Sequence, residues 1–211
     1  MILVVCALPA ELRGFAPDEG VEVLACGVGP VEAAASVARR LATTRFSAVI
    51  NAGIAGAFRG SAKVGEAMLV TSECLAELGL EGGGALTLPD GASLVGEVAA
   101  DARLVARCAG TSLPHARGLT VSAVTTTDAT AARLQRTYAP GVESMEGFAV
   151  LRAAQLAGVP ALEVRGISNY VGERSRAEWD FRAGARATVA ALEAILVPLS
   201  ATRNTNEPSK G

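Results

Sequence analysis

The stretch Val142-Glu143-Ser144-Met145-Glu146-Gly147-Phe148 leads into a run of Ala, Val and Leu that is typical of a buried helix. It carries two carboxylates three residues apart, with the flexible thioether of Met145 beside the second. A carboxylate at the mouth of such a helix lies where a strand-to-helix turn opens into a ligand crevice. The stretch therefore indicates a site that binds a polar, hydroxyl-bearing small molecule.

Short apolar runs alternate with longer Ala-rich segments along the chain, as strands and helices do in alternating folds. We expect strands at Ile2–Cys6, Val21–Cys26, Ala48–Asn51, Ala67–Thr71, Gly118–Val124 and Ala161–Ile167. We expect helices near Pro9–Phe15, Val31–Ala42, Val98–Cys108, Thr130–Tyr138, Glu146–Leu156 and Phe181–Leu196. This alternation predicts an α/β fold with a mostly parallel sheet.

The composition is that of one large domain. The chain has 211 residues, of which 50% are hydrophobic and only 19% are charged, so there is ample apolar material for a core. We expect a single domain over residues 1–199 and a polar, disordered tail over residues 200–211. The Gly-rich residues 77–95 lack a clear period and are expected to form a loop or a weak hairpin.

The charges, cysteines and histidine exclude several functions. The net charge is −2 without a basic block, so we expect neither nucleic acid nor a membrane as a partner. The start of the chain lacks the features of a signal peptide, and no apolar run reaches the length of a membrane span. Cys6, Cys26, Cys74 and Cys108 lack paired spacing, which predicts free thiols in a reducing cytoplasm. His115 is the only histidine and is expected on the surface, which excludes a His-rich zinc site and disfavours a Ser-His-Asp triad. We expect no metal and no cofactor.

Two glycine-rich segments follow expected strands. Gly27-Val28-Gly29-Pro30 is half of a dinucleotide fingerprint, because Glu32 stands where the third glycine belongs. A ligand loop at a helix start and a plain tight turn explain it equally well. Asn51-Ala52-Gly53-Ile54-Ala55-Gly56 either lets a backbone approach a ligand or forms an ordinary turn between strand and helix.

Glu11, Ser168 and Asn169 are expected at the same edge of the sheet as Glu146, because each lies at the end of a strand. An acid at the position of Glu11 also suits the dipole of the first helix. An amide both donates and accepts, so Asn169 can bind the edge of a heterocycle. A turn Asn that bonds its own backbone would give the same sequence.

Taken in order, these motifs resemble the nucleoside phosphorylase and nucleosidase family, which includes methylthioadenosine/S-adenosylhomocysteine nucleosidase. Ser144-Met145-Glu146-Gly147 and Arg165-Gly166-Ile167-Ser168-Asn169 carry the most specific part of the resemblance, which extends from Met1 to about Leu199. It implies a nucleoside phosphorylase-like three-layer α/β sandwich with a central mixed, mostly parallel sheet. It also implies a nucleoside substrate, water as a reactant and a homo-oligomer.

The resemblance implies a role for each matching residue. Glu11 would hold or deprotonate the attacking water, Glu146 would bind the ribose hydroxyls, and Met145 would pack against the sugar. Asn169 would act on the leaving purine, in the place where adenosine-type nucleosidases have Asp. The other residues expected to contact the substrate are Ile54, Gly53, Ser168 and Val124.

The sequence departs from the family pattern at two places. Phosphorylases of this family bind phosphate with an Arg and a Ser, where this chain has Asn51 and Ile54, so water is the expected nucleophile. A carboxylate only accepts, which suits the amino group of adenine, whereas Asn169 can donate to O6 of hypoxanthine. The change also removes an acid, so the leaving purine would be protonated through water or would leave with hydrogen-bond support alone.

The closest likeness is to a branch of the family whose substrate is a hypoxanthine nucleoside with a carboxylated aromatic group beyond the 5′ position. Arg174, Arg176 and Trp179 are candidates for binding that group, although a solvated surface explains the arginines equally well. A hydrolase of inosine or of methylthioadenosine is an alternative, and Asn169 counts against the second. A non-catalytic nucleoside sensor is another alternative, which the presence of both Glu11 and Glu146 disfavours.

Overall fold

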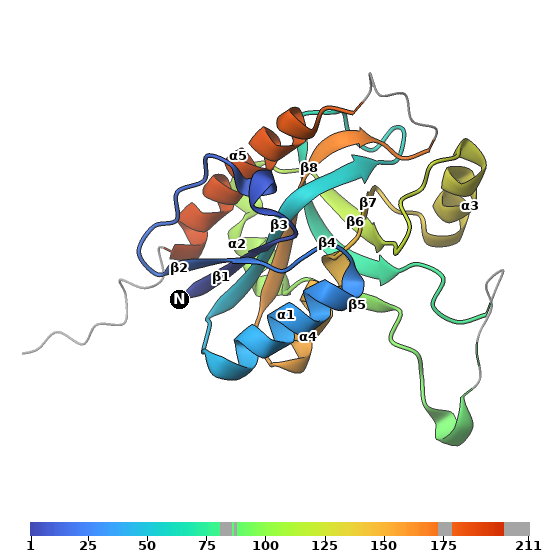
Figure 1. Cartoon of the computed structure of the whole chain (residues 1–211), viewed down its shortest axis with the longest axis horizontal. Helices are drawn as coiled ribbons and strands as arrows, with labels where there is room; N and C mark the ends of the chain where they lie inside the picture. Colours follow the sequence, from blue (N-terminus) through green and yellow to red (C-terminus); the bar gives the residue numbers. More distant parts are fainter. Residues whose placement is uncertain (81–85, 87, 173–178, 201–211) are drawn as a thin grey trace, which may run out of the picture.

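A mixed sheet of eight strands runs through the molecule, with helices on both of its faces (Figure 1). The computed structural model describes residues 1–80, 86, 88–172 and 179–200. The strands are β1 (Ile2–Cys6), β2 (Val21–Ala25), β3 (Ala48–Ala57), β4 (Ala67–Leu75), β5 (Glu97–Ala99), β6 (His115–Thr120), β7 (Val142–Ser144) and β8 (Ala161–Tyr170). The α-helices are α1 (Pro30–Thr43), α2 (Ala102–Arg107), α3 (Asp128–Tyr138), α4 (Gly147–Leu156) and α5 (Phe181–Ser200), and short 3-10 turns are η1 (Pro9–Leu12), η2 (Pro89–Gly91) and η3 (Ala109–Thr111).

The sheet combines an open parallel part with a closed ring. Along the path β2-β1-β3-β7-β6-β4-β5, the first three strands are parallel neighbours. Strand β8 lies parallel to β3 and antiparallel to β4, so β3, β8, β4, β6 and β7 close on themselves. Apolar side chains pack together where these strands meet, among them Ala55, Met68, Val142 and Ile167.

Two apolar layers hold the helices to the sheet. Helices α1 and α4 lie together on one face, where they pack against residues such as Leu3 and Val5 of β1. Helix α5 covers the other face with η1 beside it and packs against β8 and β3 (Figure 1). Because β1 is covered on both faces, all five of its residues are buried. The predicted three-layer fold with a mixed, mostly parallel sheet is confirmed.

Three predicted strands end too early, and one of them is Ala67–Thr71, because β4 continues to Leu75. Strand β3 continues through Asn51-Ala52-Gly53-Ile54-Ala55-Gly56 to Ala57, so the expected turn after Asn51 is wrong. Strand β8 likewise continues beyond Ile167 to Tyr170 and includes Asn169, which is therefore no turn residue. The predicted strand Gly118–Val124 is shifted, because β6 spans His115–Thr120. Strands β5 and β7 have three residues each and carry too short a pattern to be predicted.

Two of the predicted helices are helical only in part, and α5 extends four residues beyond the predicted end at Leu196. Pro9–Phe15 contains only the single turn η1, and Val98–Cys108 is divided between β5 and α2. Helix α2 begins after Asp101, whose carboxylate accepts from the N–H groups of Arg103 and Leu104. Within residues 77–95, the described part forms turns and η2. The expected tail lies outside the described residues beyond Ser200.

Helix α5 is, by length and composition, apolar enough to cross a membrane, contrary to the expectation that no segment reaches that length. Several of the apolar residues of α5, among them Ala191, Leu192 and Ile195, are buried in the core against the sheet. A buried core helix passes the same test, so this observation is weak support for a membrane span. The four cysteines are buried and free, as predicted, and burial raises the pKa of Cys6 to about 12.

Candidate active site

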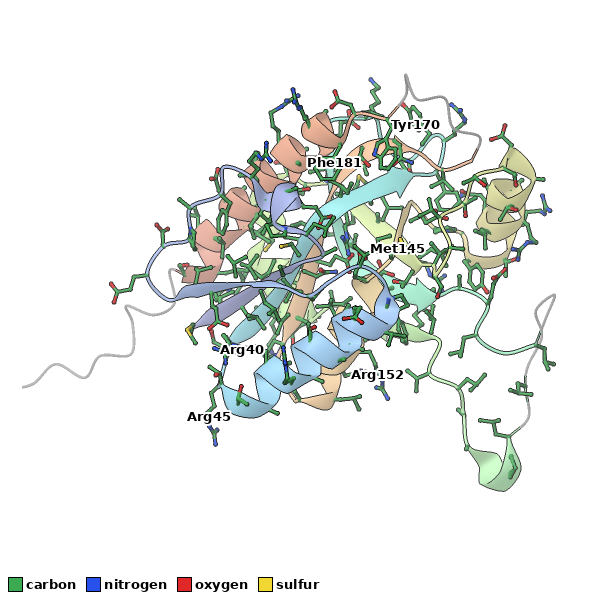
Figure 2. The ribbon with its side chains drawn as sticks, viewed as in Figure 1. Arg40, Arg45, Met145, Arg152, Tyr170 and Phe181 are labelled. Carbon is green, nitrogen blue, oxygen red and sulfur yellow. The ribbon has the colours of Figure 1, made fainter. Side chains whose placement is uncertain are left out.

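A pocket of about 350 Å³ opens at the carboxyl ends of β1, β3 and β8, the edge at which parallel sheets bind ligands. Residues of β7, of the segment after β6 and of the start of α5 complete its wall. Figure 2 shows two of the wall residues, Met145 near the middle of the molecule and Phe181 at the start of α5. The wall is largely apolar, and none of the described residues that form it is an Arg or a Lys.

Glu11 is fixed in the pocket wall by two backbone groups. Its Oε1 accepts from the N–H of Ile54 at 3.0 Å, and its Oε2 accepts from the N–H of Leu8 at 2.9 Å. The side chain is only 4% exposed. Burial raises the pKa of Glu11, and Arg165 and the two N–H groups partly oppose the shift. A carboxylate with a raised pKa in a pocket suits a general base.

Glu146 is held by the first glycine segment. It stands immediately before α4, and its Oε1 accepts from the N–H of Gly29 at 2.9 Å. Gly29 has a φ of 94°, which favours glycine, and this backbone conformation aims its N–H at the carboxylate. Val28 lines the pocket beside it. The segment is thus more than a tight turn, because it positions an acidic side chain of the pocket.

Glu143 belongs to a different part of the same wall. Its two oxygens accept from the N–H of Thr125 at 3.0 Å and from the Thr125 hydroxyl at 2.6 Å. These bonds hold the segment after β6, from which Val121 and Val124 reach the pocket. The carboxylates of Glu143 and Glu146 therefore have separate structural partners, although they lie three residues apart in the sequence.

Asn169 has a defined orientation in the pocket wall. Its Oδ1 accepts from the hydroxyl of Ser168 at 2.8 Å, and its Nδ2 donates to the carbonyl of Tyr170 at 2.9 Å. A Cβ at Gly56 would lie 3.0 Å from Nδ2, so the glycine in β3 makes room for the amide. The second Nδ2 hydrogen and the second lone pair of Oδ1 remain for a ligand.

Arg165 is a functional candidate that the sequence reasoning did not select. It is 1% exposed, its Nε donates to Oε1 of Glu163 at 2.6 Å, and its Nη1 lies 3.9 Å from Oε2 of Glu146. Burial opposes its charge, but the carboxylates of Glu163, Glu146 and Glu11 outweigh that effect and raise the pKa of Arg165. The signal was present in the predicted strand Ala161–Ile167, where Glu163 and Arg165 place two opposite charges in a run that is otherwise apolar or Gly.

The pocket brings together most of the residues predicted from the sequence. The predicted residues in its wall are Glu11, Ile54, Val124, Met145, Glu146, Ser168 and Asn169. Gly53 lies behind the wall, where a Cβ would come within 2.7 Å of Oε1 of Glu11. Asn51 is buried inside β3, and His115 is exposed at the start of β6, and neither lines the pocket. Trp179 lines it, whereas Arg174 and Arg176 lie outside the described residues.

The comparison with known proteins agrees with this geometry. The model of the phosphorylase superfamily matches residues 4–200, and the chain belongs to that family. A solved methylthioadenosine/S-adenosylhomocysteine nucleosidase from Colwellia psychrerythraea, in complex with adenine, has the same fold. Its TM-score is 0.79 at 18% identity, with 94% of this chain and 95% of the other covered.

Two relatives of higher sequence identity are futalosine hydrolases. The protein from Streptomyces coelicolor is 40% identical over 172 residues, which are 77% of this chain and 72% of the relative. The protein from Thermus thermophilus is 35% identical over 185 residues, which are 84% and 81% of the two chains. Within its family the chain is therefore an N-glycosidic hydrolase that acts on nucleosides.

Proposed function

We propose that the chain hydrolyses futalosine, releasing hypoxanthine and dehypoxanthine futalosine in the alternative menaquinone pathway. The observation that carries this proposal is the meeting of Glu11, Glu146 and Asn169, from distant parts of the sequence, in one pocket. The names of the two futalosine hydrolases that resemble the chain support the choice of substrate.

The proposed reaction proceeds through an oxocarbenium-like state of the ribose. The bond from C1′ to the purine nitrogen breaks, and its electron pair leaves with the purine. The oxygen of water bonds to C1′, Glu11 takes one proton from that water, and the purine takes up a proton from solvent. Glu146 binds the ribose hydroxyls. Both carboxylates stabilise the growing positive charge more than the neutral substrate, and such differential binding accelerates the step.

Water is the proposed nucleophile because the described residues of the pocket offer no site for a phosphate dianion. Ile54 offers an apolar side chain where a hydroxyl would be needed, and its N–H is already bonded to Glu11. Among the described residues, Arg165 is a cation close to Glu11 and Glu146 of the pocket wall, but it is ion-paired with Glu163 and Glu146. A phosphate dianion without a cation partner would therefore be repelled by the carboxylates of Glu11 and Glu146.

Replacing Asn169 with Asp should shift the preference from hypoxanthine towards adenine. The donor to the carbonyl of Tyr170 would become an acceptor, and the donor for O6 would be lost. Leaving such groups unpaired costs about 1–3 kcal/mol, so kcat/KM for inosine should fall roughly 5- to 150-fold. The ratio of kcat/KM for inosine and adenosine, measured on wild type and variant, checks this. An unchanged ratio would remove Asn169 from base selection.

We further propose that the carboxylated group of futalosine extends past Phe181 towards three arginines. A second pocket of about 260 Å³ shares Phe181 with the first and is lined by Arg13, Arg182 and Arg186. All three arginines are exposed, and a guanidinium pairs well with a carboxylate. Trp179 and Phe181 supply an apolar wall between the sugar site and these charges.

The double replacement of Arg182 and Arg186 by Ala should raise KM for futalosine roughly 3- to 10-fold, because exposed ion pairs contribute little each. KM for inosine, which lacks the carboxylated group, should stay the same. Arg45→Ala is the control, since this arginine lies near the end of α1, away from Phe181 (Figure 2). Equal effects on futalosine and inosine would contradict the assignment.

The substrate itself is tested by incubating the protein with futalosine, inosine and methylthioadenosine and assaying free hypoxanthine and adenine. Futalosine should be hydrolysed with the highest kcat/KM, and added phosphate should not change the rate. Faster hydrolysis of inosine or methylthioadenosine would establish another nucleoside as the substrate. No release from any of them would support a sensor.

We expect the enzyme to act in the cytoplasm as a homo-oligomer. The four free thiols fit a reducing compartment. Exposed apolar side chains of α1 and α4, such as Val31 and Leu156, offer a surface for a second copy. Sedimentation of the purified protein would measure its size.

A further inference from the structure

Three ionisable side chains lie buried behind the pocket without forming part of its wall. Glu73 of β4 and Glu163 of β8 are fully buried, and Arg165 of β8 is 1% exposed. We call these residues the buried triad. Burying charges is costly unless they are paired, so the protons and hydrogen bonds of the triad must be accounted for.

Two glycines reserve the space for the carboxyl groups of the triad. A Cβ at Gly118 of β6 would lie 1.9 Å from Oε1 of Glu73. A Cβ at Gly147 of α4 would lie 2.3 Å from the same atom and 2.8 Å from Oε1 of Glu163. The two carboxyl groups therefore converge on one point beneath the start of α4. This also explains why a glycine follows Glu146 in the sequence.

Each side chain of the triad has one polar atom without a hydrogen-bond partner among the described residues. Glu163 accepts from Nε of Arg165 with its Oε1 at 2.6 Å, and Glu73 accepts from the Thr120 hydroxyl with its Oε2 at 2.8 Å. Oε1 of Glu73, Oε2 of Glu163 and Nη2 of Arg165 are buried and have no hydrogen-bond partner among the described residues. Nη2 is a donor on the guanidinium that Glu163 already binds, whereas Oε1 of Glu73 converges on the carboxylate of Glu163, and two carboxylates that only accept can bond each other only through a proton.

We propose that Glu73 is protonated and donates from Oε1 to the carboxylate of Glu163, so that this carboxyl pair carries one negative charge and positions Arg165 behind the catalytic carboxylates. Glu163 carries the charge, because it is the member bonded to the guanidinium. In agreement, burial and the neighbouring Glu163 raise the pKa of Glu73 well above its usual range. The inference rests on the proposed function only in calling Glu11 and Glu146 the catalytic carboxylates of the pocket.

Arg165 lies between the carboxyl pair and the two carboxylates of the pocket wall, Glu11 and Glu146. Its Nη1 faces Oε2 of Glu146 at 3.9 Å and the carbonyl of Ile54 at 3.4 Å. At Gly53, a Cβ would lie 2.5 Å from Nη1 and 2.7 Å from Oε1 of Glu11, so both groups share the space that this glycine leaves. With Glu73 ionised, four carboxylates would surround one guanidinium. The proton removes one of these charges and keeps Arg165 available to Glu11 and Glu146.

Glu73→Gln and Glu163→Gln form a matched pair of variants. Gln at position 73 can donate to Glu163 and accept from Thr120 as the protonated acid does, so kcat and KM should stay within about twofold of wild type. Gln at position 163 removes the charge that anchors Arg165. Its kcat should fall about 10- to 100-fold, as when groups that orient a functional side chain are removed, while KM changes less.

The pH dependence distinguishes positioning from a merely structural role. The charged groups that face Glu73 are Glu163 and Arg165, both on β8. In Glu163→Gln, ionisation of Glu73 at higher pH can return one negative charge to the pair, so kcat should recover as the pH rises. The double variant Glu73→Gln/Glu163→Gln should show no recovery. A large loss of kcat in Glu73→Gln, or a Glu163→Gln variant without recovery, would overturn the proposal.

Infrared spectroscopy provides a test that needs no substrate. The carbonyl band of a protonated carboxylic acid should be present in the wild type at neutral pH and absent in Glu73→Gln, and its presence in both would overturn the assignment. If Glu163→Gln does not fold, as judged by circular dichroism, this band and the kinetics of Glu73→Gln still show whether Glu73 carries the proton. If wild type does not hydrolyse futalosine, the proposed function fails, while the infrared result still decides where the proton resides.

Discussion

Replacement of Glu11 by Gln is expected to lower kcat for futalosine about 100- to 10,000-fold, the usual contribution of a positioned general base. The amide keeps the size of the side chain but cannot take a proton from water. It can accept from only one of the N–H groups of Leu8 and Ile54, so a loss of stability on the order of 1–3 kcal/mol is also expected. Calorimetry on the inactive variant should show that futalosine still binds.

The pH profile of the wild type tests the same role. Glu11 works in its ionised form, and burial raises its pKa. The rate should therefore fall as the pH decreases, and the fall should begin at a higher pH than an ordinary Glu would give. Glu193→Gln, an exposed replacement on α5, is the control and should match wild type. A Glu11→Gln variant with near-normal kcat would show that water is activated elsewhere.

Replacement of Glu146 by Gln should impair binding and rate together. The carboxylate is proposed to bind the ribose hydroxyls in the ground state and to stabilise the positive sugar in the transition state. Hydrogen bonds to charged groups contribute about 1.5–3 kcal/mol, so KM should rise roughly 10- to 100-fold, and kcat should fall as well. Steady-state kinetics with futalosine gives both constants.

A substrate without the 2′-hydroxyl provides the control for Glu146. If the carboxylate binds that hydroxyl, deleting either partner removes the same interaction, so the two losses should not add. Glu143→Gln is the matched variant, because Glu143 bonds Thr125 and not the sugar. Its effect should be the same for both substrates. Full additivity for Glu146 would mean that another group binds the hydroxyl.

The sequence predicted most of the elements that have a clear period, and it missed the ends of several strands, two of which contain glycine. The sequence predicts that strand β3 ends at Asn51, because Gly53 and Gly56 are typical of a turn, but the strand continues to Ala57. They lie inside the strand because Arg165, Glu11 and Asn169 need the space that a side chain would fill. A glycine in a strand can mark such a close approach, but the sequence does not show which group approaches.

The residues of the pocket wall were easier to predict than the charges behind them. Glu11 and Glu146 follow strands, Asn169 lies near the end of one, and the ends of parallel strands meet at one edge. Glu163 and Arg165 are two residues apart in β8, so their side chains lie on the same face of the sheet. Their partner Glu73 belongs to β4, and only the antiparallel pairing of β4 with β8 brings it near.

The ring of strands has a consequence for the synthesis of the protein. Strand β3 is completed early in translation, but its neighbour β8 pairs with it from Val49 and Ala161 onwards, and the ring cannot close before that segment has left the ribosome. Contacts between residues so far apart form slowly, since a long loop must close first. Shortened chains that end before β8 should therefore lack Asn169, Arg165 and a closed ring, and only a nearly complete polypeptide can become active.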